Sequence, residues 1–297
     1  MHTRSGTLKA VEPFVFQRSV DFLEGFGPMA GEQDVGEGAI TKAMMVDGRV
    51  TIFRLRGAEG GLSYELFSED ALDSKMAKVL EDRISFFLSL DDDVGQFYAI
   101  AEKDLEYYPK VRELWGLHHV KFPSLLEISA WAIINQRIQR SIALRMKRAL
   151  TERYGGSLEV EGRTYWAFPD YSRMKDATPR ELLSLTKNQR TARRLGSLLE
   201  NFEELDEDFL RTAPYAKASE RLRKVNGIGE WSSQFILFRG LGRIERQQNN
   251  MKPVLRMMEE VYGPGKTLED INRAYGPWCG YWSLYLWGSS MASRSVD

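Results

Sequence analysis

Short apolar runs separated by glycine and polar residues dominate the first 88 positions and predict a small sheet. Residues 40–46 and 50–55 are two such runs, and the Asp47-Gly48 pair between them is a strong signal for a two-residue hairpin. Residues 62–67 predict a third strand. Residues 11–20 alternate more loosely and predict a further extended segment before a turn rich in glycine and proline.

Helical spacing of apolar residues takes over in the rest of the chain. It begins in residues 71–87, which predict a helix on one face of the sheet. From residue 89 onward the pattern is almost wholly helical. We therefore expect an α+β protein with a small antiparallel sheet domain at residues 1–88 and a mainly helical domain at residues 89–297.

Residues 124–154 carry the longest helical pattern. Ser124 predicts its N-cap, and Glu127, three positions on, predicts a capping box. Asn135-Gln136-Arg137 interrupts the apolar face midway along this segment. This polar island has two interpretations, a break between two core helices or a functional turn, and the periodicity does not choose between them.

Composition narrows the class of protein. The 297 residues include a single cysteine, Cys279, which rules out an internal disulfide and a site built from several cysteines. His118 and His119 are adjacent, and we expect a solvated turn there in place of a metal site. No apolar run is long enough for a membrane span, which makes a cytosolic location the default expectation. The net charge of −1 means that any affinity for nucleic acid must come from a local basic face.

Two glycines bracket an isoleucine at Gly227-Ile228-Gly229, between two helical patterns. Glycine tolerates a positive φ and lets the backbone approach a ligand, and a side chain at either position is expected to crowd the turn. The next helix is predicted to begin at Glu230-Trp231-Ser232, where its free N–H groups suit an anion. One interpretation is a hairpin that grips a DNA phosphate. The other is an ordinary tight turn in a helical protein-interaction domain.

Three segments resemble the helix-hairpin-helix superfamily of DNA glycosylases. The segment VNGIGEWSSQFILFRGLGR is similar to the hairpin signature of this superfamily. The polar island lies in SLLEISAWAIINQRIQRSIALRMKRALTERYG, which is similar to a segment of the 3-methyladenine DNA glycosylase II branch. The end of the chain, AYGPWCGYWSLYLWGSS, is similar to the closing aromatic segment of that branch. The resemblance extends over residues 83–289, and more weakly over the N-terminal sheet.

The resemblance implies a monofunctional DNA glycosylase of base-excision repair. Such enzymes extrude a damaged nucleotide from double-stranded DNA into an aromatic pocket and hydrolyse its N-glycosidic bond. We expect alkylated purines as substrates, because electron-rich rings bind a cationic base well. The family pattern also implies a monomer without cofactor or metal, near the nucleoid if the source is bacterial.

Site residues follow from the same resemblance. In the related enzymes, the residues that match Gln136 and Arg137 enter the DNA at the lesion. The hairpin contacts DNA through Gly227, Ile228 and Gly229. The base pocket is expected to be lined by Trp231, Phe235, Tyr281 and Trp287. Trp231 also stands where relatives with lyase activity carry a lysine nucleophile, which predicts that no Schiff base forms.

The catalytic aspartate of the family has no carboxylate counterpart in this sequence. Ungapped counting places that position at Met251, whereas a shift of one residue and a helix-capping argument favour Asn250. An asparagine offers a dipole but not a full charge. Three interpretations remain open: an engineered inactive form, a natural homologue that acts slowly or through another acid such as Glu245, and a DNA-binding relative without catalysis.

Overall fold

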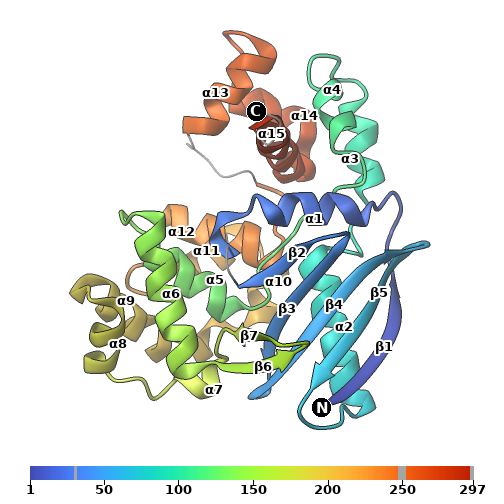
Figure 1. Ribbon diagram of the computed structural model, residues 1–297. Helices are drawn as coiled ribbons and strands as arrows, with labels where there is room; N and C mark the ends of the chain where they lie inside the picture. Colours follow the sequence, from blue (N-terminus) through green and yellow to red (C-terminus); the bar gives the residue numbers. More distant parts are fainter. Residues whose placement is uncertain (30–31, 247–251, 295–297) are drawn as a thin grey trace.

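The computed structural model describes residues 1–29, 32–246 and 252–294. The fold is α+β, as the pattern predicts, with an antiparallel sheet on one side and helices on the other (Figure 1). In the part of the chain that the structure describes, no helix is both long and apolar enough to cross a bilayer.

The sheet has five antiparallel strands in the order β1-β5-β4-β3-β2. The three predicted strands are confirmed as β3, β4 and β5, and Asp47-Gly48 forms the predicted turn with φ values of 49° and 72°. The pattern gave no indication of β1, an edge strand that is largely polar and exposed. The strand bounds are β1 (His2–Lys9), β2 (Gln33–Gly36), β3 (Ala39–Val46), β4 (Arg49–Ala58) and β5 (Gly61–Ser68).

The extended segment predicted at residues 11–20 is wrong. Helix α1 (Phe16–Glu24) occupies its second half and crosses one end of the sheet (Figure 1). Phe16, Val20 and Leu23 lie four and three residues apart and are all buried, which is the spacing of one helix face. Within the ten residues 11–20, too few helical turns are present for the helical period to be distinguished from a loose alternation.

Both faces of the sheet are covered, one of them by the helix that the pattern predicted at residues 71–87. Helix α2 (Ser74–Leu88) packs on one face, where the rings of Phe53 and Phe87 lie 5.9 Å apart. The other face packs against a second hairpin, β6 (Gly156–Val160) and β7 (Arg163–Ala167), which follows the longest helical segment. This hairpin was not predicted, because its strands have five residues each and interrupt a helical stretch.

The remaining helices form the rest of the molecule. Their bounds are η1 (Gly27–Met29), α3 (Val94–Ala101), α4 (Tyr108–Glu113), α5 (Leu125–Ile134), α6 (Arg140–Tyr154), α7 (Tyr171–Met174), α8 (Pro179–Thr186), α9 (Gln189–Glu200), η2 (Phe202–Leu205), α10 (Glu207–Thr212), α11 (Tyr215–Arg223), α12 (Glu230–Phe235), η3 (Ile236–Gly240), α13 (Lys252–Tyr262), α14 (Leu268–Tyr275), η4 (Gly276–Trp278) and α15 (Cys279–Arg294).

The long segment 124–154 is broken at the polar island into α5 and α6, which confirms a helix break at that island. Ser124 caps α5, because its Oγ accepts a hydrogen bond from the Glu127 amide at 3.1 Å. The Glu127 side chain does not complete a capping box. It accepts a hydrogen bond from Lys147 Nζ on α6 at 2.8 Å instead, which ties the two helices together inside the core.

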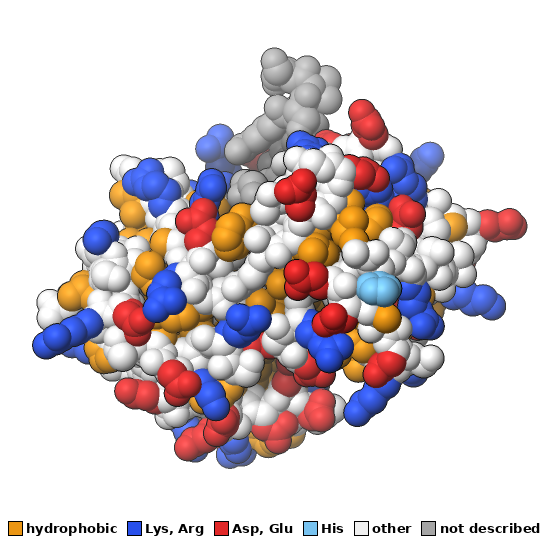
Figure 2. Space-filling view, turned by 60° about the horizontal axis from the view of Figure 1, so that its bottom comes forward, with side chains coloured by type: hydrophobic (Ala, Val, Ile, Leu, Met, Phe, Trp, Pro, Cys, Tyr) orange, Lys and Arg blue, Asp and Glu red, His pale blue; other side chains and the backbone are white. Residues whose placement is uncertain are grey.

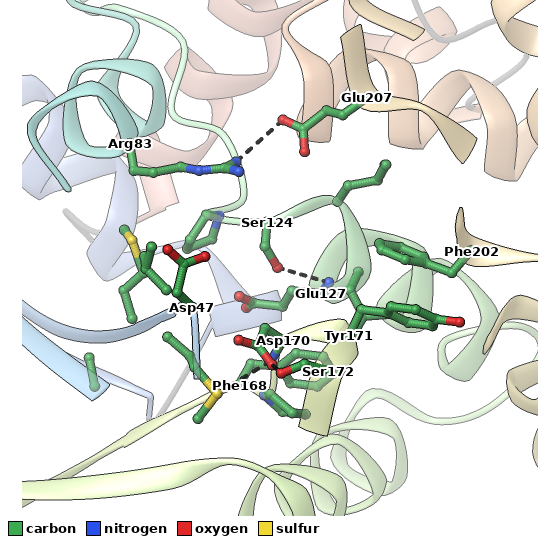
Figure 3. A pocket seen from close by; sticks show the side chains of 18 residues that line it. Asp47, Arg83, Ser124, Glu127, Phe168, Asp170, Tyr171, Ser172, Phe202 and Glu207 are labelled. Carbon is green, nitrogen blue, oxygen red and sulfur yellow. Dashed lines mark hydrogen bonds and ion pairs between the residues drawn. The ribbon is translucent and has the colours of Figure 1, made fainter. Parts of the chain in front are cut away.

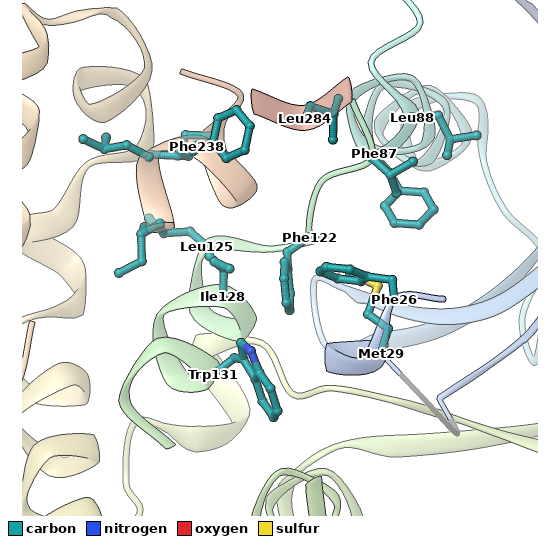
Figure 4. Packing of buried hydrophobic residues seen from close by; sticks show 14 of the residues in the cluster. Phe26, Met29, Phe87, Leu88, Phe122, Leu125, Ile128, Trp131, Phe238 and Leu284 are labelled. Atoms are coloured by element: carbon teal, nitrogen blue, oxygen red, sulfur yellow. The ribbon is translucent and has the colours of Figure 1, made fainter. Parts of the chain in front are cut away.

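The core continues from the sheet into the helices without a gap. Figure 4 shows Phe122 facing Phe26 on one side and Trp131 of α5 on the other. The solvated turn predicted at His118-His119 is wrong, because both side chains are completely buried. Burial lowers the pKa of His119 well below its usual value, and Arg239 and Lys121 lower it further.

Candidate nucleic-acid interface and base pocket

The Gly-Ile-Gly segment joins α11 to α12 and depends on Gly227. This residue has a φ of 102°, and a Cβ there would lie 2.7 Å from Cγ and Cδ of Arg194. Ile228 is buried and anchors the turn. The expectation that Gly229 is also crowded is wrong. Its φ is −91°, a Cβ there meets nothing within 4 Å, and it serves as the N-cap of α12.

The polar island lies directly against this hairpin. Gln136 Nε2 lies within hydrogen-bonding distance of the Gly227 carbonyl at 2.7 Å and of Ser232 Oγ at 3.1 Å. Gln136 Oε1 accepts a hydrogen bond from Arg194. The glutamine side chain is therefore held inward by the hairpin, and Arg137 is the exposed residue at the tip of the turn. Its φ of 56° is unusual for a residue with a side chain.

Several arginines gather beside the hairpin without carboxylate partners among the described residues. Arg190 and Arg193 of α9 are exposed, and Arg194 is half-buried. Burial lowers the pKa of Arg194, and the charges of Arg190, Arg193 and Arg137 lower it further. Three arginines, Arg137, Arg194 and Arg223, line an open groove of about 640 Å³ along the hairpin. Mutual repulsion of this kind is relieved when an anion binds.

A row of aromatic rings runs from the hairpin into the molecule. Trp231 is 41% exposed at the groove and stacks on Phe235, with ring centroids 5.2 Å apart. Phe235 contacts Phe122 edge-on at 6.3 Å, and Phe122 contacts Phe26 at 5.9 Å. Trp287 of α15 meets Phe26 at 6.4 Å. Three of the four predicted pocket residues, Trp231, Phe235 and Trp287, thus belong to one continuous row. Helices α12 and α15 supply these three rings, and Phe122 and Phe26 from the segments before α5 and after α1 join them.

The fourth, Tyr281, lies outside this row in the closed core. Its side chain is 0% exposed, its hydroxyl donates to Asp92 Oδ2 at 2.6 Å and accepts from the His119 amide at 3.1 Å. Burial, followed by the charge of Asp92, raises the pKa of this phenol well above its usual value. Tyr281 therefore serves as a hydrogen-bonded core residue in this structure.

Both the sequence and the fold are similar to those of known proteins. No family model matches the sequence. A DNA-3-methyladenine glycosylase of Bacillus subtilis is 28% identical over 214 residues, which cover 68% of this chain and 69% of that protein. The solved 3-methyladenine DNA glycosylase of Archaeoglobus fulgidus superposes with a TM-score of 0.75 at 20% identity, over 95% of this chain and 97% of its own.

This chain is a homologue of the helix-hairpin-helix DNA glycosylases. A further fold relative is the Clostridium acetobutylicum 8-oxoguanine glycosylase/lyase, solved in complex with double-stranded DNA that contains cytosine opposite 8-oxoguanine. It superposes with a TM-score of 0.72 at 16% identity, and the match covers 98% of each chain.

One residue beside the inner end of the aromatic row, Arg239, was not singled out by the sequence analysis. Arg239 lies in η3, the π-helical turn that continues α12, and it is only 5% exposed. Its guanidinium lies 4.6 Å from the ring centre of Phe26 and 5.8 Å from that of Trp287. The sequence did carry a signal for this residue. Arg239 follows Phe235 by four positions and Trp231 by eight, which is the spacing of residues on one helix face.

The candidate catalytic position cannot be placed, because Asn250 and Met251 lie outside the described residues. Glu245, the alternative acid, is described. Its carboxylate contacts Arg243, with 2.7 Å between Oε1 and Nε. Arg243 also donates to the carbonyls of Leu210 and Ala213 at 2.7 and 2.9 Å. Glu245 is thus held in an ion pair that ties the segment after η3 to the end of α10.

A second cavity of about 340 Å³ lies between the sheet and the helices, away from the hairpin. Figure 3 shows Asp47, Glu127 and Asp170 around it. Two of these carboxylates have structural partners: Glu127 pairs with Lys147, and Asp170 accepts from the Gly48 amide at 2.6 Å. Figure 2, which brings the lower side of Figure 1 forward, shows basic and acidic side chains interspersed. Neither feature resembles an anion-binding surface.

Proposed function

We propose that this protein is a monofunctional DNA glycosylase of base-excision repair that removes alkylated purines from double-stranded DNA. The observation that carries the proposal is the hydrogen bond between Gln136 and the Gly227 carbonyl. It joins the turn that bears Arg137 to the hairpin, beside a cluster of arginines that form no ion pair with a described carboxylate. Homology to DNA glycosylases supports an enzyme of this class.

The hairpin and the arginine cluster suit the DNA backbone. Gly227 keeps a side chain away from the turn and allows Arg194 to pack against it. Arg223 presents an exposed cation along the groove, and the exposed Arg190 and Arg193 lie close enough to Arg194 to lower its pKa by their charge. Phosphate contacts of this kind fix the position of a protein on the duplex without reading its sequence.

Arg137 is the group that we assign to the gap left by an extruded base. It stands at the tip of a turn whose neighbouring residue, Gln136, is fixed by hydrogen bonds to the hairpin. A guanidinium is planar and stacks on neighbouring bases. The extruded base then enters the aromatic row that begins at Trp231.

The reaction is hydrolysis of the bond between C1′ of the sugar and the base nitrogen. The base leaves with the bonding electrons, the sugar acquires oxocarbenium character, and water supplies the hydroxyl at C1′. A nearby carboxylate stabilises that positive charge in glycoside hydrolases. Asn250 supplies only a dipole, and we expect the chain as it stands to act slowly. With Trp231 where relatives with lyase activity carry a lysine, no Schiff base is part of the proposal.

Single-turnover release of base from a methylated duplex tests the chemistry. We expect Asn250→Asp to release base on the order of 100-fold faster than the unaltered chain, because it restores a full charge opposite the oxocarbenium ion. Glu245→Gln is the matched control and should change the rate less than twofold. A rate for the unaltered chain that matches Asn250→Asp and is lost in Glu245→Gln would move the catalytic role to Glu245.

Binding to an abasic-site analogue tests the scaffold independently of catalysis. We expect the chain to prefer a duplex with the analogue over undamaged duplex, with an affinity that falls as salt rises. Absence of any preference would overturn the glycosylase proposal. Preference without base release from either chain would identify a binder of damaged DNA.

A further inference from the structure

Helix α9 supports the Gly-Ile-Gly hairpin although it is not part of that motif. It packs against α5, next to the segments that carry the hairpin (Figure 1). The side-chain stem of Arg194 lies against Gly227, where a Cβ would come within 2.7 Å of it. One turn further along α9, Ser197 Oγ accepts a hydrogen bond from the Asn226 amide at 3.2 Å. Two residues on one helix thus hold the first half of the hairpin.

The guanidinium of Arg194 has one hydrogen-bond acceptor among the described residues. Its Nη1 donates to Gln136 Oε1, and no described carboxylate forms an ion pair with it. A guanidinium has five N–H donors in one plane. Arg194 therefore keeps further donors for a ligand in the open groove, which it lines together with Gln136.

Gln136 connects this arginine to the turn between α5 and α6. Its Nε2 lies 2.7 Å from the Gly227 carbonyl, 3.1 Å from Ser232 Oγ and 3.1 Å from the Ala132 carbonyl. With Arg194 on its Oε1, the glutamine has partners on α5, the hairpin, α12 and α9. Moving the side chain out would leave these partly buried groups without their partners, which is costly. The next residue in the chain is the arginine at the tip of the turn.

The charges around Arg194 favour an anion in the groove. Burial lowers its pKa, and Arg190, Arg193 and Arg137 lower it further by their positive charges. A phosphate relieves this repulsion, and an arginine can bind one phosphate through two parallel N–H donors. One plane of donors can therefore hold a DNA phosphate and Gln136 at the same time.

We propose that Arg194 is a positioning residue: it binds a DNA phosphate and, through Gln136, fixes Arg137 in the gap left by the extruded base. This inference rests on the proposed glycosylase function and deepens it. Gln136 stays bound to the protein, and Arg137 alone enters the duplex. Because the phosphate contact and the inserted residue are rigidly connected, DNA that offers a phosphate and a gap at matching positions is preferred over intact duplex.

The test compares binding to an undamaged duplex with binding to the same duplex carrying an abasic-site analogue. The ratio of the two affinities measures insertion, and Arg137→Ala shows the ratio that is left without the inserted side chain. Arg194→Lys keeps the charge but loses the planar donors. We expect its affinity for undamaged DNA to change less than about twofold, because the charge is retained. The ratio should fall about tenfold, the range for one hydrogen bond to a charged group.

A double-mutant cycle tests whether Arg194 acts through Gln136. Gln136→Met has a side chain of similar length and accepts no strong hydrogen bond. It should lower the affinity ratio by a factor similar to that of Arg194→Lys. The combined variant should show no further fall, since both changes remove the same contact. Independent effects that multiply would overturn the proposed connection.

Two other arginines serve for comparison. Arg193→Ala removes an exposed cation of α9, and we expect it to weaken binding to both duplexes by the same factor and to leave their ratio unchanged. Arg148→Lys makes the same substitution as Arg194→Lys at an exposed, ion-paired arginine on α6, and it should change neither affinity.

The possible outcomes separate this inference from the proposed function. An unchanged ratio in Arg194→Lys, or an equal loss of affinity for both duplexes, would overturn the inference, because a distorted hairpin or a simple phosphate contact gives that result. If Gln136→Met does not fold, the comparison of Arg194→Lys with Arg193→Ala still decides. If the unaltered chain does not prefer the abasic-site analogue over undamaged DNA, the proposed function is overturned, and the inference with it.

Discussion

Gly227 and Gly229 show how one tripeptide contains two different glycines. Gly227 has a positive φ and packs against Arg194, whereas Gly229 has ordinary backbone angles and open space around its Cα. The sequence motif makes them look equivalent. Only Gly227 sits where both backbone strain and contact exclude a side chain.

Replacing Gly227 should therefore weaken both the fold and DNA binding. We expect Gly227→Ala to lower the free energy of unfolding by about 1–3 kcal/mol and to weaken binding to an abasic-site duplex. Gly229→Ala is the matched control, and its effect should stay below about 1 kcal/mol, as for other changes at an N-cap glycine. Denaturant unfolding and titration of the same two variants give both quantities. Equal effects at the two positions would contradict this assignment.

At the scale of elements, one buried ion-pair cluster holds α5 to α6. Lys147 Nζ lies 2.8 Å from Glu127 Oε1 and 2.6 Å from Glu32 Oε2, and its side chain is 1% exposed. Burial by itself raises the pKa of Glu127, but Lys147 and Lys42 outweigh it and lower that pKa. Burial likewise lowers the pKa of Lys147, and the carboxylates of Glu127 and Glu32 raise it.

Loss of the cation from this cluster should strongly destabilise the folded protein. Lys147→Met leaves two carboxylates facing each other, and we expect it to reduce the free energy of unfolding at pH 7 by about 3–5 kcal/mol. Arg148→Met, which breaks an exposed pair on the same helix, should cost less than about 1 kcal/mol.

The contribution of this ion-pair cluster to stability should depend on pH in a definite direction. A carboxyl whose pKa is lowered by folding stabilises the protein above its unfolded pKa, which is 4.5 for Glu127, and that contribution is lost as the pH falls through the folded pKa. The difference in stability between the unaltered chain and Lys147→Met should therefore shrink from pH 7 toward pH 4. Urea unfolding at both pH values measures it, and a constant difference would show that the charges do not matter.

For the whole molecule, the charges nearly cancel, with 41 basic and 42 acidic side chains. DNA affinity must then come from the few arginines around the hairpin. Each phosphate contact contributes about 0.9 to the slope of log affinity against log salt. We expect Arg193→Ala to lower the magnitude of this slope by about one. Lys78→Ala, at an exposed and ion-paired lysine on α2, should leave it unchanged. Similar slopes for both variants would place the DNA elsewhere.

Much of the fold could be predicted from local patterns. The Asp47-Gly48 hairpin, the strands around it and the Ser124 cap of α5 each depend on neighbouring residues, and the structure contains them. Residues 11–20 and the β6–β7 hairpin were missed, because their windows are too short for a period to be distinguished. The burial of His118 and His119 was missed as well, since adjacent polar residues give no sign of the distant segments that pack over them, such as Phe238 of η3.

By itself, the sequence determined most of the element types and the positions of the Gly-Ile-Gly turn and of the polar island, because these follow from local spacing. The family came from the resemblance of three segments to known DNA glycosylases. Only the tertiary structure decided that Gln136 bonds to Gly227, 91 residues away, that Tyr281 is closed in the core and that Arg239 ends an aromatic row without an anionic partner among the described residues. These features depend on which distant segments pack together. A side chain's partners, and hence its charge and its chemistry, are set by that packing.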